Sequence, residues 1–325
     1  MSAERPAPRP APHLAPRPAP RPAAATGIRY AGIGDEAGVG LADQLAALDR
    51  LGWDAIELRT LDGIPVAGLD DRAFDRLAEV LSLRGTAVVA VDARIGNWAG
   101  SIAGGFAPDL AELDVLARRC AVLGTRYVRV MSYPNAGLDD AEWERRVLAR
   151  FAVLACRAQD AGLVLLHENC AGWAGADPRR TLRLLESVGS PALGVLFDTG
   201  NGLAYGYQAY PMLRVLLDHV RHVHVKDATR GRAGPVYTVP GAGEAGVAGC
   251  LRLLLAGGYR GSWSLEPHLS LRPHEATDRG RTGSDLAAGF VASGRALERL
   301  VRTEILPDFP AWRAAPGGLT REPAP

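Results

Sequence analysis

The stretch Gly194-Val-Leu-Phe-Asp198-Thr-Gly-Asn201 shows the pattern that decides the fold, because an apolar run typical of a buried strand ends at a carboxylate. Three further stretches repeat this pattern and place a side chain of a metal-binding type at or near the end of a strand-like run. The gaps between these polar residues approximate one strand-plus-helix unit or a little more, as expected when parallel strands deliver side chains to one rim. The three stretches are Leu163-Val-Leu-Leu-His-Glu168-Asn169, His222-Val-His224-Val-Lys226-Asp227 and Trp263-Ser-Leu-Glu266-Pro-His268.

The same alternation of strand-like and helix-like segments extends through most of the chain. Helical stretches carry apolar residues at helical spacing, and Gly124 and Gly162 are expected to end two of them. Strictly alternating pairs predict an α/β fold with a parallel sheet, and eight pairs predict a closed (β/α)8 TIM barrel in a single domain. The predicted strands are 28–33, 55–58, 86–91, 127–131, 163–166, 193–197, 220–225 and 262–265, and the predicted helices are 41–51, 74–83, 110–123, 143–159, 182–188, 211–218, 247–255 and 286–301.

Two terminal segments differ from the barrel, which we place at residues 26–305. Residues 1–25 consist mainly of Ala and Pro with interspersed Arg, so this tail is predicted to be disordered. Residues 306–325 are expected to form an extension that packs on the outside of the barrel through Phe309 and Trp312.

Composition excludes several classes of function. The net charge of +1 predicts no nucleic-acid partner, because proteins that bind nucleic acids usually carry a basic surface. No apolar run approaches the roughly 20 residues of a membrane span, and the four cysteines show no paired spacing. We therefore expect a cytoplasmic protein with no membrane partner and with reduced cysteines. Trp98 and the tyrosines at 205, 207 and 210 could equally form walls for a sugar ring or contacts between copies of the chain, so a homo-oligomer stays open.

The four strand-end residues predict a metal site. Parallel barrels form their active sites at the carboxyl ends of the strands, where Glu168, Asp198, His224 and Glu266 are expected to lie. Three carboxylates and one imidazole suit a single divalent cation, with Mn²⁺ preferred and Mg²⁺, Co²⁺ or Zn²⁺ as alternatives.

Six short motifs together resemble the sugar phosphate isomerase/epimerase family of xylose isomerase-like TIM barrels, and the resemblance covers roughly residues 27 to 303. It implies that Glu168, Asp198, His224 and Glu266 bind the metal and that Glu168 and Glu266 also act as acid and base on opposite sides of the substrate. It further implies that Arg230 holds a substrate oxygen, and we expect Asn201, Lys226, Glu57 and His268 to contact substrate as well. The motifs are Gly52-Trp-Asp-Ala-Ile-Glu57-Leu-Arg59, Val128-Arg129-Val130, His167-Glu168-Asn169, Phe197-Asp198-Thr199-Gly200-Asn201, His224-Val-Lys226-Asp227 and Leu265-Glu266-Pro267-His268.

Two departures from well-understood epimerases of this family point away from a ketohexose substrate. Asn201 stands where those enzymes carry a second histidine, and Ala174 stands where they carry a glutamate. The predicted function is a divalent-metal-dependent isomerase or epimerase that acts on a sugar, sugar phosphate or related polyol through a metal-stabilised enediolate. The alternative is a metal-dependent dehydratase or lyase that acts on a keto-sugar, keto-inositol or keto-glycoside.

Two other classes are disfavoured. A trinuclear zinc endonuclease needs extra histidines at the second, third and fourth strand ends, and the segments 57–59, 92–94 and 131–132 contain none. A non-catalytic binding barrel would have no need for the whole ligand set. We interpret Gly241-Ala-Gly243-Glu244 as a tight turn that precedes a helix rather than as a phosphate cradle.

Overall fold

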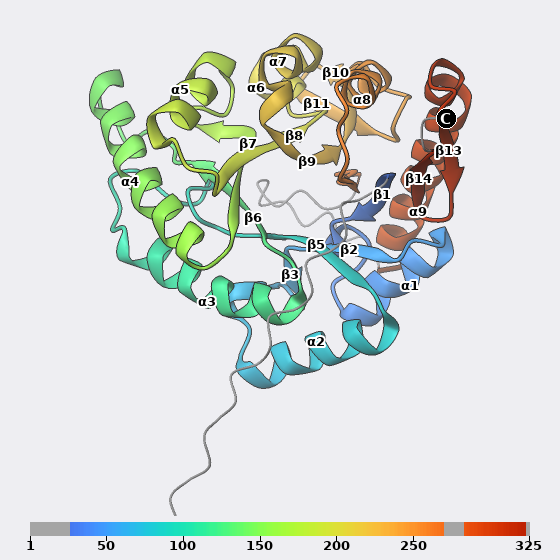
Figure 1. The fold of residues 1–325 in the computed structure, drawn as a ribbon, viewed down its shortest axis with the longest axis horizontal. Coiled ribbons are helices and arrows are strands. Elements are labelled where there is room, and N and C mark those ends of the chain that lie inside the picture. The colour runs from blue at the N-terminus through green and yellow to red at the C-terminus, as the bar shows by residue number, and fades with distance from the viewer. Residues whose placement is uncertain (1–26, 270–282, 323–325) are drawn as a thin grey trace, which may run out of the picture.

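Strands and helices alternate along the chain, and the helices form an outer ring around the strands (Figure 1). The computed structural model describes residues 27–269 and 283–322, so the tail predicted for residues 1–25 lies outside the described residues. The eight barrel strands are β1 (Gly27–Gly32), β2 (Ala55–Leu58), β5 (Ala87–Asp92), β6 (Tyr127–Ser132), β7 (Val164–Gly172), β8 (Leu193–Asp198), β9 (Val220–Val225) and β12 (Ser262–Leu265).

The helices follow their strands in sequence, as the apolar periodicity predicts. The barrel helices are α1 (Leu41–Leu51), α2 (Asp71–Arg84), α3 (Ala107–Leu123), α4 (Asp140–Asp160), α5 (Pro178–Val188), α7 (Ala209–Leu216), α8 (Val247–Ala256) and α9 (Gly283–Leu300). The shorter helical segments are η1 (Gly34–Glu36), η2 (Val66–Gly68), α6 (Gly202–Tyr205), η3 (Leu217–His219), η4 (Val301–Ile305) and η5 (Leu306–Asp308). The predicted (β/α)8 TIM barrel is confirmed.

Local chemistry sets where the helices begin and end. Asp139 begins α4, because its side chain accepts a hydrogen bond from the backbone N–H of Glu142 at 2.9 Å. Gly124 ends α3 in the left-handed region at a φ of 73°, a conformation that favours glycine. Among the described helices, none is long and apolar enough to cross a membrane.

The barrel strands are parallel, but β1 and β2 are joined in an unusual way. The hydrogen-bonded order is β13-β14-β1-β12-β9-β8-β7-β6-β5-β2. The seam between β1 and β2 is bridged at Ile33 and Glu57, which lie at the carboxyl end of the barrel. At the other end of β1, residues Gly27 to Arg29 pair with β14 instead of with β2.

The C-terminal extension is more ordered than the sequence predicts. It forms a hairpin of β13 (Trp312–Ala315) and β14 (Gly318–Arg321), and β14 runs antiparallel to β1. Trp312 is buried, as expected, and Phe309 is partly buried against the core. The extension therefore adds two strands to the barrel sheet rather than only packing on its exterior (Figure 1).

The main hydrophobic core lies between the strands and the helices. Val195 and Phe197 of β8 belong to it together with Val223 and Val225 of β9. Because successive strand residues point to opposite faces, His222 and His224 point the other way, into the barrel. Because the apolar side chains of each strand pack against the helices, the alternating polar side chains point into the barrel.

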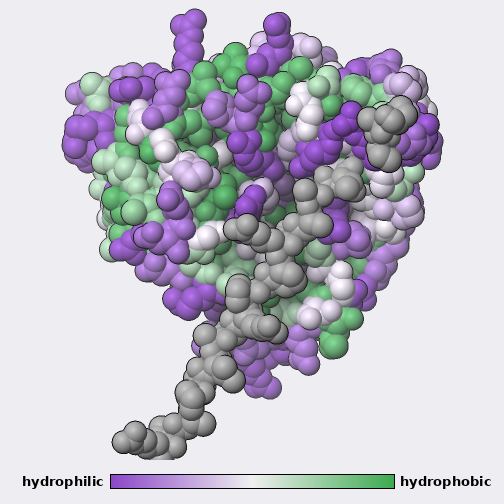
Figure 2. Space-filling model, in the orientation of Figure 1, coloured by the Kyte–Doolittle hydropathy of each residue, from purple (hydrophilic) through white to green (hydrophobic). Residues whose placement is uncertain are grey.

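Two small hairpins and α6 cover the carboxyl end of the barrel. The hairpins are β3 (Thr60–Leu61) with β4 (Ile64–Pro65), and β10 (Asp227–Gly231) with β11 (Gly234–Thr238). The sequence does not predict these rim elements. On the molecular face seen in Figure 2, hydrophilic side chains predominate along the edges and hydrophobic ones lie between them.

Candidate metal centre and its pocket

Four side chains from neighbouring strands converge at the carboxyl end of the barrel. Glu168 lies in β7, Asp198 ends β8, and His224 lies near the end of β9. Glu266 directly follows β12, the next strand of the sheet. One potential ligand atom from each residue lies within 4.8 Å of those from the other three, and all four residues are buried. The structure therefore brings the whole predicted ligand set together.

The spacing and chemistry of these atoms fit one divalent cation. His224 Nδ1 lies 3.3 Å from Glu266 Oε2 and 4.0 Å from both Glu168 Oε1 and Asp198 Oδ2. Ligands bound at about 2.1 Å from a common cation are separated by about 3 to 4 Å. His224 Nδ1 and Asp198 Oδ2 make no hydrogen bond within the described chain, although Asp198 Oδ2 forms an ion pair with Lys226. Buried polar atoms in this state are rare, and a cation would satisfy both of these.

Asp198 is oriented by the turn that follows it. Its Oδ1 accepts hydrogen bonds from the backbone N–H groups of Gly200 and Asn201, at 2.6 and 2.8 Å. The side chain of Asn169 continues the pairing of β7 with β8, because it bonds both the N–H and the carbonyl of Asp198. Asp198 Oδ1 is therefore hydrogen-bonded to the backbone, and Asp198 Oδ2 faces the other three ligand residues. Burial and the nearby carboxylates Glu266 and Glu168 raise the pKa of Asp198 to about 6, against the opposing effect of Lys226.

His224 is oriented from behind by Glu57. The two carboxylate oxygens of Glu57 lie 2.9 Å from His224 Nε2 and 2.7 Å from His222 Nε2. Burial alone would raise the pKa of Glu57, but the two histidines hold it well below its usual range. An ionised Glu57 accepts hydrogen bonds, so each Nε2 donates its proton and His224 Nδ1 faces the other three ligands. The prediction that Glu57 contacts substrate is corrected, because Glu57 is fully buried beneath His224 and does not line the pocket.

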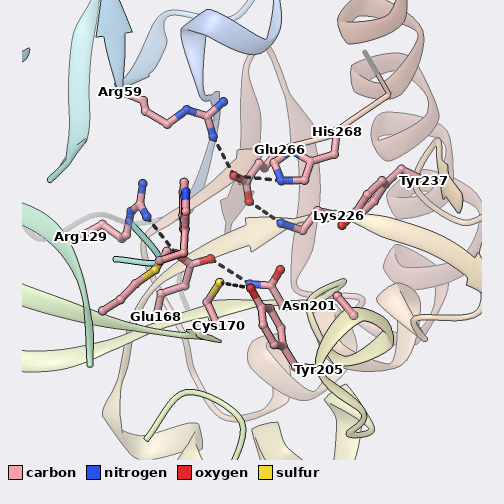
Figure 3. A pocket seen from close by; sticks show the side chains of 13 residues that line it. Arg59, Arg129, Glu168, Cys170, Asn201, Tyr205, Lys226, Tyr237, Glu266 and His268 are labelled. Carbon is pink, nitrogen blue, oxygen red and sulfur yellow. Dashed lines mark hydrogen bonds and ion pairs between the residues drawn. The ribbon is translucent and has the colours of Figure 1, made fainter. Parts of the chain in front are cut away.

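Glu266 lies between the positively charged side chains of Arg59 and Lys226. Its Oε1 accepts a hydrogen bond from Arg59 Nη1 at 2.9 Å, and its Oε2 accepts one from Lys226 Nζ at 2.7 Å (Figure 3). Burial disfavours the charged carboxylate, but Lys226, His268 and His224 together hold the pKa of Glu266 well below its usual range. Arg59 also bonds Asp35 and Glu36, which fixes the direction of its guanidinium group. Glu266 is therefore held ionised and in one orientation.

Glu168 has a similar arrangement on the other side of the pocket. Its Oε1 accepts a hydrogen bond from Asn201 Nδ2 at 2.9 Å, and its Oε2 lies 3.4 Å from Arg129 Nη1 (Figure 3). Arg129 also pairs with the buried Asp92 at 2.9 Å. Each of the two glutamates thus has an arginine beside one oxygen. Asp35 and Glu36 hold Arg59 in place, and Asp92 holds Arg129.

The pocket above the cluster is small and is lined by both charged and apolar side chains. Its cavity volume is about 20 Å³. Glu168, Glu266, Asn201, Lys226 and His268 line it, as predicted, whereas Asp198 and His224 lie behind the lining side chains. The remaining lining residues are Arg59, Trp98, Arg129, Met131, Cys170, Ala204, Tyr205 and Tyr237.

Arg59 and Arg129 are the main residues that the sequence-based site omits. Both stand in motifs that carry the family resemblance; Arg59 directly follows β2, and Arg129 lies within β6. Strand position was therefore a usable indication for Arg59, and the motif alone for Arg129. Trp98 and Tyr205 line the pocket, whereas the hydroxyl of Tyr207 donates a hydrogen bond to the backbone carbonyl of Asn169.

Arg230 does not lie where the resemblance implies. It stands in the β10–β11 hairpin, its side chain is 76% exposed, and its Nε lies 3.9 Å from Glu244 Oε2. It is not among the residues that line the pocket. Because its side chain is exposed and lies outside the pocket lining, the structure does not bring Arg230 together with the other predicted substrate contacts.

His268 is held in place by Glu36. Its Nδ1 lies 2.9 Å from Glu36 Oε1, and its backbone N–H donates to Glu36 Oε2. His268 has a φ of 50°, which is uncommon for a residue other than glycine and is found where function constrains the backbone. Its Nε2 lies 3.8 Å from Glu266 Oε1. His268 therefore stands beside one of the two glutamates with its ring orientation fixed.

The loop at 241–245 serves the fold rather than a ligand. The carboxylate of Asp227 accepts hydrogen bonds from the backbone N–H groups of Gly241, Gly243 and Ala245. These amides are occupied and do not form a phosphate cradle. The loop leads directly into α8, in agreement with its interpretation as a turn.

Comparison with known proteins identifies two kinds of enzyme among the relatives. The family model described as "Xylose isomerase-like TIM barrel" matches residues 45–282. The 2-epi-5-epi-valiolone 7-phosphate 2-epimerase of Actinoplanes sp. (strain ATCC 31044 / CBS 674.73 / SE50/110) is 30% identical over 225 residues, which make up 66% of this chain and 78% of that protein. The inosose dehydratase of Geobacillus kaustophilus (strain HTA426) is 33% identical over 92 residues, which make up 28% of this chain and 29% of that protein.

Solved structures show the same fold. The structure described as IOLI protein with a binding zinc atom superposes with a TM-score of 0.66 at 17% identity. The superposition covers 85% of this chain and 99% of that one. At this level of identity, the likeness concerns the fold.

Proposed function

Because this chain belongs to the xylose isomerase-like TIM barrel family, we propose that it is a divalent-metal-dependent isomerase or epimerase of a sugar, sugar phosphate or related polyol. The observation that carries the proposal is the pairing of two glutamates across one small pocket, each fixed by an arginine, with Asp198 and His224 completing the four-residue ligand cluster. A cation held there, Mn²⁺ by preference, would stabilise the negative charge that develops on the substrate oxygen when a neighbouring C–H loses its proton.

The two glutamates can transfer protons on opposite faces of a substrate. Glu168 reaches the pocket from β7 and Glu266 from the end of β12, with β8 and β9 between those strands. One glutamate, as the carboxylate, removes a proton from the carbon next to the carbonyl and becomes protonated, and the other, as the carboxylic acid, returns a proton from the opposite side. This sequence inverts one carbon centre, which is the outcome of an epimerase. The epimerase among the relatives acts on a valiolone phosphate by name, which supports a polyol ketone as substrate.

Four neighbouring side chains keep both glutamates in position for this proton transfer. Arg59 and Lys226 each donate a hydrogen bond to one oxygen of Glu266. Asn201 donates a hydrogen bond to one oxygen of Glu168, and Arg129 forms an ion pair with the other. Trp98, Tyr205 and Tyr237 give the pocket wall aromatic surface, which helps to exclude water. A cavity of about 20 Å³ holds about one water molecule. Side chains that line the pocket must therefore move when a substrate enters.

A dehydratase is the second candidate, and His268 favours it. Elimination of water needs a base at the C–H and an acid at the departing hydroxyl group. Glu266 and His268 lie side by side, and the Glu36 carboxylate fixes the imidazole. The inosose dehydratase relative supports the same choice.

Solvent deuterium incorporation distinguishes these outcomes and tests the glutamates. The Mn²⁺-loaded protein is incubated in D2O with ketoses, sugar phosphates, inososes and keto-glycosides, and the products are analysed by NMR after removal of the metal. Deuterium at a carbon next to the carbonyl in a stereoisomer supports the epimerase, and a dehydrated product supports the alternative. Absence of exchange with every substrate class would contradict both.

Glu168→Gln and Glu266→Gln should each lower turnover by about 10² or more, because each removes a base but keeps the shape of the side chain. The control is Glu244→Gln, which changes an exposed rim glutamate in the same way. Excess Mn²⁺ corrects any loss of metal affinity. Full turnover and full exchange in both glutamine variants under excess Mn²⁺ would show that these residues are ligands only.

A further inference from the structure

A second cavity lies at the opposite end of the barrel from the two glutamates. It forms where β6 and β9 begin and where the chain enters β12, whereas the metal centre lies where these strands end. Its volume is about 340 Å³, which is within the range of small-molecule sites. The lining residues are Tyr127, Leu217, Asp218, Val220, Arg221, Gly257, Gly258, Tyr259 and Arg260.

Two arginines of this cavity have no carboxylate partner among the described residues. Arg221 Nη1 donates to the backbone carbonyls of Asp218 and Val220, at 2.8 and 3.1 Å. Arg260 Nη1 donates to the carbonyl of Tyr259 at 2.7 Å, and its guanidinium stacks on Trp312. A guanidinium group has five N–H donors, so most donors of both side chains remain for a ligand. The backbone contacts also hold both groups at the cavity.

Two more arginines increase the positive charge there. Arg126 stacks on the Tyr127 ring, with its Cζ 5.2 Å from the ring centroid. Arg321 pairs with Trp312 across the β13–β14 hairpin, and Trp312 is the ring on which the Arg260 guanidinium stacks. Neither Arg126 nor Arg321 forms an ion pair within the part of the chain that the structure describes. In contrast, Arg252 on the neighbouring α8 pairs with Asp308 at 3.0 Å.

The charge at this cavity is a local feature. The whole chain has a net charge of +1, whereas the cavity is lined by two arginines, Arg221 and Arg260, and one carboxylate, Asp218. Arg126 and Arg321 lie outside the lining, each beside a residue that lines it or stacks on it. Asp218 and Arg221 are both exposed to solvent, which screens their charges, whereas Arg260 is partly buried. Like charges held together without counter-ions disfavour the free protein, and an anionic ligand relieves this repulsion.

We propose that this cavity binds the phosphate group of a small phosphorylated molecule. Guanidinium groups bind phosphate oxygens through paired, directed N–H donors, and Arg221 and Arg260 supply two such groups at one cavity. Tyr127 and Tyr259 offer aromatic surface for the organic part of the ligand. The site is separate from the metal centre, because β9 runs the length of the barrel between Val220 at this cavity and His224 at the ligand cluster.

Isothermal titration calorimetry on the full-length, metal-loaded protein tests this site in phosphate-free buffer of low ionic strength. The probes are inorganic phosphate, glucose 6-phosphate and glucose. We expect saturable binding of the two phosphate-bearing probes and none of glucose. Tighter binding of glucose 6-phosphate than of phosphate would assign the site to an organic phosphate. Equal affinities would assign it to the phosphate group alone.

The double variant Arg221→Gln, Arg260→Gln should weaken phosphate binding about tenfold or more, because charge-assisted donors are lost. The matched control is Arg145→Gln, Arg183→Gln, which removes the same charge from two exposed positions on α4 and α5 and should bind as the wild type does. Unchanged affinity in the Arg221, Arg260 variant would overturn the proposal, as would an equal loss in the control. Absence of saturable binding of either phosphate-bearing probe would also overturn it.

Discussion

Glu57 determines which nitrogen of His224 faces the ligand cluster. It bonds the Nε2 atoms of two histidines from one strand, and it also stands at the bridge that joins β1 to β2. Carboxylates in such positions fix the tautomer and ring direction of a metal-binding histidine. One buried residue therefore connects the closure of the barrel with the geometry of the metal centre.

Glu57→Gln should weaken metal binding by about 10- to 100-fold, the usual effect of losing the hydrogen-bond partner of a ligating histidine. The amide keeps the size of the side chain but no longer accepts two N–H bonds with a full charge. Calorimetric titration of the metal-free protein with Mn²⁺ gives the dissociation constant. Glu244→Gln should bind Mn²⁺ as the wild type does, and wild-type affinity in Glu57→Gln would show that His224 keeps its orientation without the charge.

The sequence identifies the potential metal ligands near the strand ends, but it does not identify the residues that hydrogen-bond to those ligands from other strands. Glu168, Asp198, His224 and Glu266 could be predicted because strand ends and side-chain alternation are visible along the chain. The position of Glu57 beneath His224 depends on a contact between β2 and β9, which lie far apart in sequence. The position of Arg230 could not be predicted for a similar reason, since the β10–β11 hairpin that carries it was not predicted and only the structure shows that its side chain is exposed.

At the scale of elements, the C-terminal hairpin covers a seam of the barrel. β14 pairs with the first half of β1, where β2 forms no ladder with β1. A Cβ on Gly27 or Gly318 would collide with the backbone of the opposite strand, so the two strands approach unusually closely. The eight strand and helix pairs follow from periodicity, whereas this hairpin is short and its partner strand lies at the other end of the sequence.

Leu319→Ala should destabilise the protein by about 2 to 5 kcal/mol, the usual cost of truncating a fully buried leucine. Leu319 is 2% exposed and pairs with Ile28 of β1. Urea denaturation measures the change in the free energy of unfolding. Thr320→Ala, at the exposed neighbouring position, is the control, and equal stability of the two variants would show that β14 does not support the barrel.

At the scale of the whole molecule, the ligand cluster should link metal binding to stability. Three buried carboxylates meet at one point, and a bound cation reduces their mutual repulsion. At a free metal concentration 100-fold above the dissociation constant, a ligand of the native state stabilises it by about 2.7 kcal/mol.

Removal of metal by a chelator should therefore lower the melting temperature, and added Mn²⁺ should restore it. Differential scanning calorimetry with and without chelator measures the shift. The variant Asp198→Asn, His224→Gln lacks two ligands and should melt at the same temperature under both conditions. A wild-type melting temperature that does not respond to chelation or to Mn²⁺ would contradict a metal site at this cluster.

The position of β1 also affects how the chain folds as it is synthesised. β1 leaves the ribosome before the other described strands, yet its hydrogen-bonded neighbours, β12 and β14, are translated after nearly all of them. Pairing between segments so distant in sequence is slow, and an unpaired strand edge is prone to aggregation in the meantime. Both edges of β1 therefore stay without their main hydrogen-bonded partners until β12 and β14 have been translated, and the strand is open to non-native pairing during that time.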